Sequence, residues 1–257
     1  MNKIIFVGTS SGYPSPNRAC SSIIIDIDGR LFQLDAGEGF ARSALNLNIN
    51  YNFIEKIFIS HLDPDHIVGI FQELQLMHLT RRDLSLEIFV PEEGVTGLAA
   101  ACDMFYLFKE KFTFTRDFHA IGQSTITIDG VFSLRALPNR HLQRAEKLIK
   151  QFGKPNKMQS YSFLIEAADK KMLYSGDIES EKDILPYLGE VRTVIVDGFH
   201  ADLRLLIGAC AETGVERIIV THINETNPPA INELTAIAQK SGLRELVFAE
   251  DGLTVQV

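Results

Sequence analysis

The segment IFISHLDPDH (Ile57–His66) places four side chains that can bind a metal directly after a short apolar run. The run Ile57–Ile59 predicts a buried strand that ends at Ser60. The four candidate ligands are His61, Asp63, Asp65 and His66. A loop that leaves a buried strand can hold several polar side chains at fixed positions outside the core. Imidazole and carboxylate groups together suit a borderline divalent cation, so the segment predicts Zn²⁺, with Mn²⁺ or Fe²⁺ as alternatives.

The same order, a predicted strand followed by a residue that can bind metal, recurs later in the chain. The residues in these positions are His141, Asp177, His200 and His222. With His61 and His66, five of the seven histidines therefore follow predicted strands, which randomly scattered surface histidines would not do. This recurrence favours a metal site over a polar loop whose histidines are incidental. The other two, His78 and His119, are interpreted as packed histidines.

Strands and helices must bring these distant residues together, and their order predicts an α/β protein. The dipeptides Asp28-Gly29 and Asp129-Gly130 each lie between two predicted strands and are signals for two-residue hairpins. After the central loop, apolar residues recur at helical spacing from Ile67 to Met77. Since several strands are joined by hairpins, the sheets are expected to be mixed rather than purely parallel. The sequence shows no internal repeat and no low-complexity linker, so residues 1–257 are predicted to form a single domain.

The composition is that of an ordinary globular protein that is not generally basic. Of the 257 residues, 46% are hydrophobic and 23% are charged, and the net charge of −8 argues against a broadly basic nucleic-acid-binding surface. Cys20, Cys102 and Cys210 are far apart and are expected to be reduced and mostly buried in a cytoplasmic protein. The apolar stretch at the N-terminus is too short for a signal peptide, and no segment approaches the ~20 apolar residues of a membrane span.

One segment departs from this acidic balance. Between residues 140 and 157 one acid, Glu146, accompanies six basic residues, which are Arg140, Arg144, Lys147, Lys150, Lys154 and Lys157. Apolar residues from Leu142 to Phe152 follow a helical spacing, and Gly153 with Pro155 predicts the end of the helix. Two interpretations remain open. The segment is either a cationic flap beside the metals that attracts a phosphate-bearing substrate, or an amphipathic surface helix whose basic face is solvated.

The sequence resembles the metallo-β-lactamase superfamily over nearly its whole length. The motif of that superfamily is HxHxDH, and the corresponding segment here, His61–His66, has Asp63 in place of the second histidine. The N-terminal half is most similar to tRNase Z (ribonuclease Z), through the segments Gly8–Ser22, Leu34–Arg42, Ile54–Ile70 and Met172–Asp177. The segments Thr221–Pro228 and Phe248–Gly252 resemble instead the PQQ biosynthesis protein B branch of the superfamily.

This resemblance implies an αββα sandwich, with two mixed β-sheets flanked by helices, and two bound divalent metal ions. It implies that one metal is held by His61, Asp63, His141 and Asp177. The second metal would be held by Asp65, His66, Asp177 and His222, so that Asp177 bridges the two ions. Asp63 supplies oxygen where the superfamily motif supplies nitrogen. This change adds negative charge, which keeps Mn²⁺ and Fe²⁺ as alternatives to Zn²⁺ or weakens that site.

The resemblance also suggests catalytic roles. Asp65 would orient or deprotonate the attacking water as well as bind metal, and His200 would protonate the leaving group. Asp35 and Glu38 precede a predicted helix. They would support the metal-binding histidines or cap that helix, and a mixture of the two roles is favoured.

The favoured function is a dinuclear metal-dependent hydrolase related to ribonuclease Z, which cleaves a phosphodiester or another ester with a metal-bound hydroxide. Two alternatives stay open, an iron-dependent oxygenase or oxidase like PQQ biosynthesis protein B and a non-catalytic metal-binding module. Typical tRNase Z enzymes carry a long glycine- and proline-rich arm in the interval that corresponds to residues 142–176. Its absence here disfavours RNA relative to a small phosphodiester. By the same resemblance a homodimer is expected, and a membrane partner is not.

Overall fold

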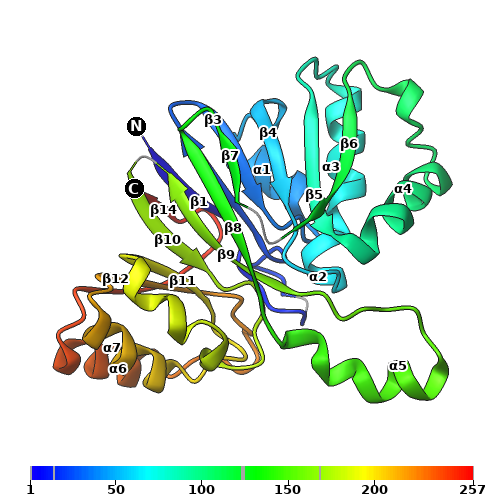
Figure 1. Ribbon diagram of the computed structural model, residues 1–257. Coiled ribbons are helices and arrows are strands. Elements are labelled where there is room, and N and C mark those ends of the chain that lie inside the picture. The colour runs from blue at the N-terminus through cyan, green and yellow to red at the C-terminus, as the bar shows by residue number, and fades with distance from the viewer. Residues whose placement is uncertain (1, 14, 123–124, 168, 257) are drawn as a thin grey trace. The chain divides into compact units, whose positions relative to one another are not determined.

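The computed structural model describes residues 2–13, 15–122, 125–167 and 169–256. The chain divides into two compact units, Met1–Ile121 with Glu250–Val257 and Gly122–Ala249. Each unit contains a seven-stranded mixed sheet (Figure 1). The predicted α/β class, with two mixed sheets flanked by helices, is thereby confirmed. The single domain predicted for residues 1–257 stays a prediction.

In the first unit, the sheet has the strand order β14-β1-β2-β3-β4-β5-β6. Its strands are β1 (Lys3–Gly8), β2 (Ser22–Ile27), β3 (Arg30–Leu34), β4 (Ile54–Phe58), β5 (Leu86–Pro91), β6 (Arg116–Ile121) and β14 (Thr254–Gln256). The pairs from β14 to β3 are antiparallel, and those from β3 to β6 are parallel. The loops that follow β3 and β4 therefore leave the sheet at the same edge, where open α/β sheets place their ligand sites.

The helices of the first unit bury one apolar face against this sheet. They are α1 (Phe40–Asn46), α2 (Pro64–Ile67), α3 (Gly69–Leu79) and α4 (Val95–Met104), with 3₁₀ segments at Tyr51–Phe53, Glu92–Gly94 and Lys109–Lys111. Phe40 of α1 and Ile70 of α3 belong to the same buried cluster as Ile57 of β4. The apolar spacing from Ile67 to Met77 is thus confirmed as the buried side of α2 and α3. Burying each such side chain stabilises the fold by roughly 1.5–3 kcal/mol.

In the second unit, the sheet has the strand order β13-β12-β11-β10-β9-β8-β7. Its strands are β7 (Ile126–Ile128), β8 (Phe132–Pro138), β9 (Tyr161–Ala167), β10 (Lys170–Tyr174), β11 (Thr193–Asp197), β12 (Arg217–Thr221) and β13 (Glu245–Phe248). The pairs from β7 to β10 are antiparallel, and those from β10 to β13 are parallel. The carboxyl ends of β10, β11 and β12 therefore lie at one edge of this sheet.

The helices of the second unit fall into two groups. They are α5 (Glu146–Phe152), α6 (Leu203–Thr213) and α7 (Ile231–Ser241), with 3₁₀ segments at His141–Ala145, Glu181–Asp183 and Leu185–Glu190. Leu206 of α6 and Leu234 of α7 share a buried cluster with Val194 of β11. Figure 1 shows α6 and α7 side by side and α5 apart from both. Of the described α-helices of this unit, α6 and α7 contribute to its core together with the 3₁₀ segment Leu185–Glu190, whereas no residue of α5 is buried.

Both predicted Asp-Gly hairpins are confirmed. The backbone φ angles are 51° at Asp28 and 87° at Gly29, and they are 49° at Asp129 and 70° at Gly130. Ile27 pairs with Arg30, so Asp28 and Gly29 form a two-residue loop with the sign pattern of a type I′ turn, whose twist matches that of the flanking strands and which favours Asp-Gly. Ile128 pairs with Phe132, so β7 and β8 are joined by three residues, Asp129, Gly130 and Val131, instead of the predicted two. These turns account for the antiparallel pairs β2–β3 and β7–β8.

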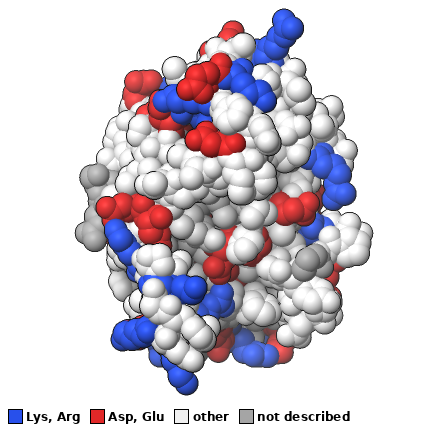
Figure 2. All heavy atoms as spheres, turned by 90° about the vertical axis from the view of Figure 1, so that its right-hand side faces the viewer, with Lys and Arg blue, Asp and Glu red and all other residues white. Residues whose placement is uncertain are grey.

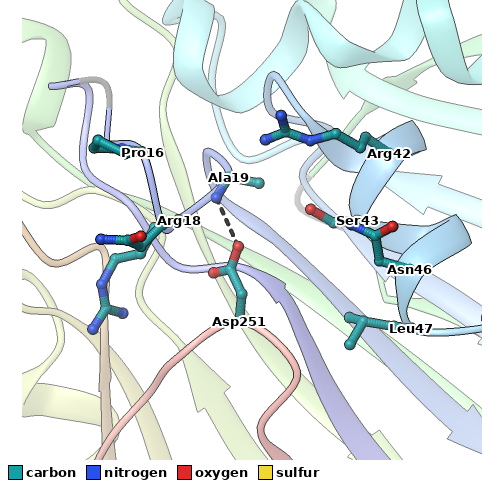
Figure 3. A pocket seen from close by; sticks show the side chains of 9 residues that line it. Pro16, Arg18, Ala19, Arg42, Ser43, Asn46, Leu47 and Asp251 are labelled. Carbon is teal, nitrogen blue, oxygen red and sulfur yellow. Dashed lines mark hydrogen bonds between the residues drawn. The ribbon is translucent and has the colours of Figure 1, made fainter.

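The loop between β1 and β2 is held by a residue near the other end of the chain. The Asp251 carboxylate accepts a hydrogen bond from the Thr9 hydroxyl across 2.7 Å. It also accepts one from the Ala19 backbone N–H across 2.7 Å (Figure 3). Burial raises the pKa of Asp251. A pocket of about 390 Å³ opens beside this contact, between Arg18 and Arg42 (Figure 3). Within the described part of the chain, no predicted site residue lines this pocket.

The cysteines agree with the expectation that they are mostly buried and form no disulfide. Cys20, Cys102 and Cys210 are free and buried. Burial raises the pKa of Cys20 to about 11 and that of Cys210 to about 12, so both are thiols at neutral pH. Among the described residues, no helix is long and apolar enough to cross a membrane.

Candidate metal centre

The predicted ligands of the first unit lie together in the loop that follows β4. His61 and His66 have ring centroids 4.1 Å apart, and both are fully buried. His61 Nε2 is 3.8 Å from Asp63 Oδ2, and His66 Nε2 is 3.4 Å from Asp65 Oδ2. Pro64 begins α2 directly after Asp63, and the Asp63 side chain accepts no capping hydrogen bond from that helix. The loop and the short helix thus give each imidazole a carboxylate neighbour.

Asp35, just after β3, orients both histidines. One of its oxygens accepts a hydrogen bond from the Ser60 backbone N–H (2.7 Å), and the other accepts from the Ser60 hydroxyl (2.9 Å) and from His66 Nδ1 (2.8 Å). Because the Ser60 hydroxyl donates to Asp35, its oxygen accepts from His61 Nδ1 at 3.0 Å. Both imidazoles therefore carry a proton on Nδ1 and present the Nε2 lone pair, which is the form that binds metal.

This arrangement decides between the two roles that the sequence left open for Asp35. The carboxylate supports the histidines, and α1 begins after Gly39 without any side-chain cap.

Glycines bring neighbouring loops close to the same ligands. A Cβ atom on Gly37 would lie 2.4 Å from the Asp65 backbone oxygen, and one on Gly12 would lie 3.2 Å from Asp65 Oδ2. The loop after β1 thus borders the Asp65 carboxylate.

The second unit gathers its ligands around Asp177, which follows β10. Asp177 Oδ2 is 3.7 Å from His141 Nε2, and Asp177 Oδ1 is 3.3 Å from His222 Nε2. His141 follows β8 and His222 follows β12, so the cluster is assembled from three strand ends. All three residues are buried. A carboxylate whose two oxygens face different imidazoles has the geometry of a bridging ligand.

Asp197, the last residue of β11, connects His222 with His200. Its Oδ2 is 2.7 Å from His200 Nδ1, and its Oδ1 is 3.2 Å from His222 Nδ1. The backbone N–H of Phe199 also donates to Asp197, across 2.8 Å. Burial and the nearby Asp177 raise the pKa of Asp197, but the two histidines outweigh them and hold this pKa below its ordinary value. Asp197 is therefore a carboxylate, and each histidine bound to it carries its proton on Nδ1.

Side-chain hydrogen bonds from Asn139 connect the backbone around these ligands, and two residues adopt an uncommon backbone conformation. Asn139 Nδ2 donates to the Asp177 backbone oxygen across 3.0 Å, and Asn139 Oδ1 accepts from the His141 backbone N–H across 3.2 Å. Asp35 (φ 57°) and His222 (φ 55°) both adopt the left-handed conformation. This conformation is uncommon for residues with a side chain and is concentrated at functional sites.

The distances in both clusters fit a divalent metal. Donor atoms of a tetrahedral site with bonds of ~2.0–2.1 Å lie about 3.4 Å apart. The imidazole-to-carboxylate distances are 3.4 and 3.8 Å in the first unit and 3.3 and 3.7 Å in the second. In the second unit, one ligand atom each of Asp177, Asp197, His200 and His222 lie within 4.8 Å of one another. The mixture of imidazole nitrogen and carboxylate oxygen is typical of Zn²⁺ sites.

The basic segment, residues 140–157, is helical and exposed. A 3₁₀ segment and α5 cover His141–Phe152, and α5 ends at Gly153 (φ 58°), as predicted. No residue of α5 is buried, and Leu148 and Phe152 have exposed fractions of 57% and 60%. Figure 2 shows Lys and Arg side chains gathered in the lower part of the face in view, where Figure 1 places α5. The predicted helix is confirmed, and part of its apolar stripe is open to solvent.

Sequence reasoning found the members of each cluster but missed residues that position them. Asp197 and Asn139 were given no role, although each is a polar residue at a strand end, two or three positions before a histidine. That position was the available signal. The His78 ring lies 5.5 Å from the Phe112 ring and the His119 ring lies 5.2 Å from the Phe89 ring, and both histidines are half-buried, so their interpretation as packed histidines stays a prediction.

Comparison with known proteins identifies relatives of this chain. A family model described as anti-Pycsar protein Apyc1 matches residues 2–237. Ribonuclease Z of Nitrosopumilus maritimus is 40% identical over 99 residues, which cover 38% of this chain and 33% of that protein. This match therefore spans about a third of the relative's length. Ribonuclease Z of Archaeoglobus fulgidus is 23% identical over 303 residues, which cover 99% of this chain and 97% of that protein.

Solved structures show the fold. The metallo-β-lactamase fold protein YhfI from Bacillus subtilis matches with a TM-score of 0.76 at 16% identity, covering 99% of this chain and 98% of that one. Human tRNase Z, short form, matches with a TM-score of 0.74 at 17% identity, covering 99% of both chains. Zn²⁺-bound PqqB from Methylobacterium extorquens matches with a TM-score of 0.68 at 14% identity, covering 99% of this chain and 100% of that one. The chain therefore has the metallo-β-lactamase fold, as its ligand motif predicted.

Proposed function

The chain belongs to the family described as anti-Pycsar protein Apyc1, and from this premise we propose that it is a dinuclear metal-dependent hydrolase that cleaves a phosphodiester. The orientation of four histidines carries the proposal. Each presents its Nε2 atom to a carboxylate oxygen at 3.3 to 3.8 Å, and they are His61, His66, His141 and His222. The names of the curated relatives, ribonuclease Z, agree with hydrolysis of a phosphodiester.

The proposed ligand sets follow the superfamily motif residue by residue. One metal takes His61, Asp63, His141 and Asp177, and the other takes Asp65, His66, Asp177 and His222. The bridging role of Asp177 is supported by its two oxygens, which face His141 and His222 separately. Zn²⁺ is the proposed metal because each set combines two imidazole nitrogens with two carboxylate oxygens, a donor mixture that zinc sites use. Mn²⁺ and Fe²⁺ are the alternatives because Asp63 replaces a nitrogen donor with an oxygen.

Two side chains of this protein are proposed to move protons in the reaction. Bound divalent ions would lower the pKa of a water toward ~7 and stabilise negative charge on the phosphate. Asp65 orients that water and accepts its proton. His200 donates a proton to the leaving oxygen from Nε2, because Asp197 occupies its Nδ1. The His200 side chain is 18% exposed and so accessible to a substrate, and such acid catalysis contributes ~10²–10⁴-fold.

A small phosphodiester is the proposed substrate, in preference to RNA. The net charge of −8 disfavours an extended nucleic-acid surface. Between His141 and Asp177 the described residues form the basic segment and the strands β9 and β10, and the sequence of this interval holds no glycine- and proline-rich arm. Positive charge on the basic segment favours an anionic phosphate substrate over a neutral ester.

The test combines metal analysis with a chromogenic substrate. We expect about two metal ions per chain in the purified protein, and hydrolysis of bis(p-nitrophenyl) phosphate that a chelator abolishes and added Zn²⁺ or Mn²⁺ restores. An Asp63→His variant, which restores the superfamily motif, should retain Zn²⁺ at least as well as the wild type. A single iron per chain, with oxygen consumption and no diesterase activity, would instead support the oxygenase alternative. Sites that bind none of the three metals would support a non-catalytic module.

A further inference from the structure

The basic segment brings one cation, Arg144, into contact with a proposed metal ligand. Arg144 lies three residues after His141 in the same 3₁₀ segment, and side chains at this spacing are eclipsed along a 3₁₀ helix. An N–H group of the Arg144 guanidinium is 3.1 Å from His141 Nε2. Since a guanidinium has donors only and is always charged, His141 Nε2 must be the acceptor. The contact therefore uses the lone pair that His141 would offer to a metal.

This contact shows that Arg144 reaches the metal-facing side of His141. The same Nε2 atom is 3.7 Å from Asp177 Oδ2, so the guanidinium approaches a histidine and carboxylate pair that is suited to a divalent cation. A metal ion and a guanidinium cannot share one lone pair, and their charges repel. Metal binding must therefore displace the Arg144 guanidinium from Nε2, while its backbone remains one helical turn from the ligand.

The other cations of the segment have different surroundings. Arg140 lies 3.1 Å from Glu179, and Lys150 lies 2.6 Å from Glu146. Lys147 forms no ion pair with any residue of the described chain. Arg144 is thus distinguished by its contact with a ligand rather than by charge alone.

We propose that Arg144, once displaced by metal, binds the non-bridging oxygens of the phosphate group of the substrate. The planar guanidinium fork matches two phosphate oxygens, and Arg144 is exposed beside the candidate ligand His141, where a phosphate group could reach it. In this role Arg144 is a specificity-determining residue that favours anionic phosphodiesters over neutral esters. The proposal rests on the proposed function and extends it. Of the two interpretations of the basic segment, it develops the cationic flap and assigns the contact with the substrate phosphate to Arg144.

The experiment measures phosphate and metal binding as well as turnover, on the full chain. Arg144→Ala, Arg144→Lys and the control Lys147→Ala are loaded with Zn²⁺, and inorganic phosphate is titrated calorimetrically. We expect phosphate affinity to fall ~10-fold or more in Arg144→Ala, to recover in part in Arg144→Lys, and to change less than ~2-fold in Lys147→Ala. Zn²⁺ affinity, measured by chelator competition, should be equal or higher in Arg144→Ala, because a competing cation is gone.

Hydrolysis of bis(p-nitrophenyl) phosphate provides the second readout. Arg144→Ala should raise KM more than it lowers kcat. Hydrolysis of the neutral ester p-nitrophenyl acetate should be unchanged, if the wild type shows it. Unchanged phosphate affinity in a fully loaded Arg144→Ala protein would overturn the proposal, and so would loss of Zn²⁺ in this variant, since that would make Arg144 a positioning residue for His141. A wild type that binds Zn²⁺ and phosphate but cleaves no diester would overturn the proposed function alone.

Discussion

The two clusters of candidate ligands are built in different ways. In the first unit, the four residues come from one loop of six positions, His61–His66, directly after β4. In the second unit, His141, Asp177 and His222 come from the ends of three strands, and up to 81 positions of sequence (141 to 222) lie between them. The first cluster therefore depends on the conformation of one loop. The second depends on the register of a whole sheet.

Each cluster nevertheless uses one buried aspartate in the same way. Asp35 contacts His66 directly and His61 through Ser60, and Asp197 contacts His200 and His222. Both aspartates lie at the ends of strands. A carboxylate in this position fixes the tautomer and the ring orientation of a histidine, whether that histidine is local or distant. The two clusters therefore share a buried aspartate that orients histidines, here called the anchor (Asp35 or Asp197), and they do not share the sequence spacing of their ligands.

The distributed cluster should be the more sensitive of the two to loss of one residue, because Asp177 is its centre. Asp177→Ala should reduce the metal content from about two ions to one or fewer and lower diesterase activity by more than ~10³-fold. This expected loss of activity exceeds the ~10–100-fold loss that is typical when a residue that only hydrogen-bonds a metal ligand is mutated. Elemental analysis measures the metal content, and kinetics with bis(p-nitrophenyl) phosphate measure the diesterase activity. Glu166→Ala, which removes an exposed carboxylate, is the matched control. Retention of two metals by Asp177→Ala would remove it from the ligand set.

His200 separates catalysis from metal binding within the second cluster. His200→Ala should keep the metal content of the wild type, because His222, Asp177 and His141 remain. Its kcat should fall ~10²–10⁴-fold, because the proposed proton donor to the leaving oxygen is gone. Elemental analysis and kcat at saturating metal measure these two effects. Equal turnover in the variant and the wild type would exclude His200 as the acid.

The two anchors provide a direct test of the comparison. Asp35→Asn and Asp197→Asn should each weaken Zn²⁺ binding ~10–100-fold, since both disturb the tautomer of a ligand. With saturating metal, Asp35→Asn should recover most of its kcat, whereas Asp197→Asn should not, because Asp197 also orients His200. Chelator competition and kcat at saturating Zn²⁺ distinguish the two. If both variants recovered equally, the anchors would be equivalent and Asp197 would have no catalytic part.

The smallest effect on activity is expected for Glu73, which lies behind the first cluster. Gln33 donates to Glu73 Oε2 across 3.1 Å and to the Asp35 backbone oxygen across 2.9 Å, and burial raises the pKa of Glu73 to about 8. Between the ordinary pKa of a glutamate and about pH 8, the unfolded chain loses this proton and the folded chain keeps it. The free energy of unfolding should therefore fall with rising pH in this window, by up to ~1.4 kcal/mol per pH unit.

Glu73→Gln should remove this contribution and change diesterase activity by less than ~2-fold. Urea denaturation of the metal-free protein at pH 5, 6.5 and 8 measures the free energy of unfolding of both proteins. The variant should gain stability relative to the wild type as the pH rises. Parallel pH dependences for the two proteins would show that Glu73 is ionised in the folded chain.

Predictions from sequence succeeded where the relevant interactions are local. The hairpin turns at Asp28-Gly29 and Asp129-Gly130, the helix after the central loop and the end of α5 at Gly153 all depend on backbone preferences within a few residues. The ligand loop after β4 was predictable for the same reason. Asp197 was missed because its role depends on His222, which follows the neighbouring strand β12 and is 25 positions away in sequence.

Residue type and periodicity were enough to predict the candidate ligands, the strands that precede them and the mixed sheets. The folded structure was needed to see that Asp35 supports histidines instead of capping α1, that Asp197 connects His200 with His222, and that Arg144 contacts His141. These contacts depend on strand register and side-chain direction, which no local pattern specifies. The physical reason is that an aspartate at a strand end has the same local signature whether it caps a helix, binds a metal or orients an imidazole.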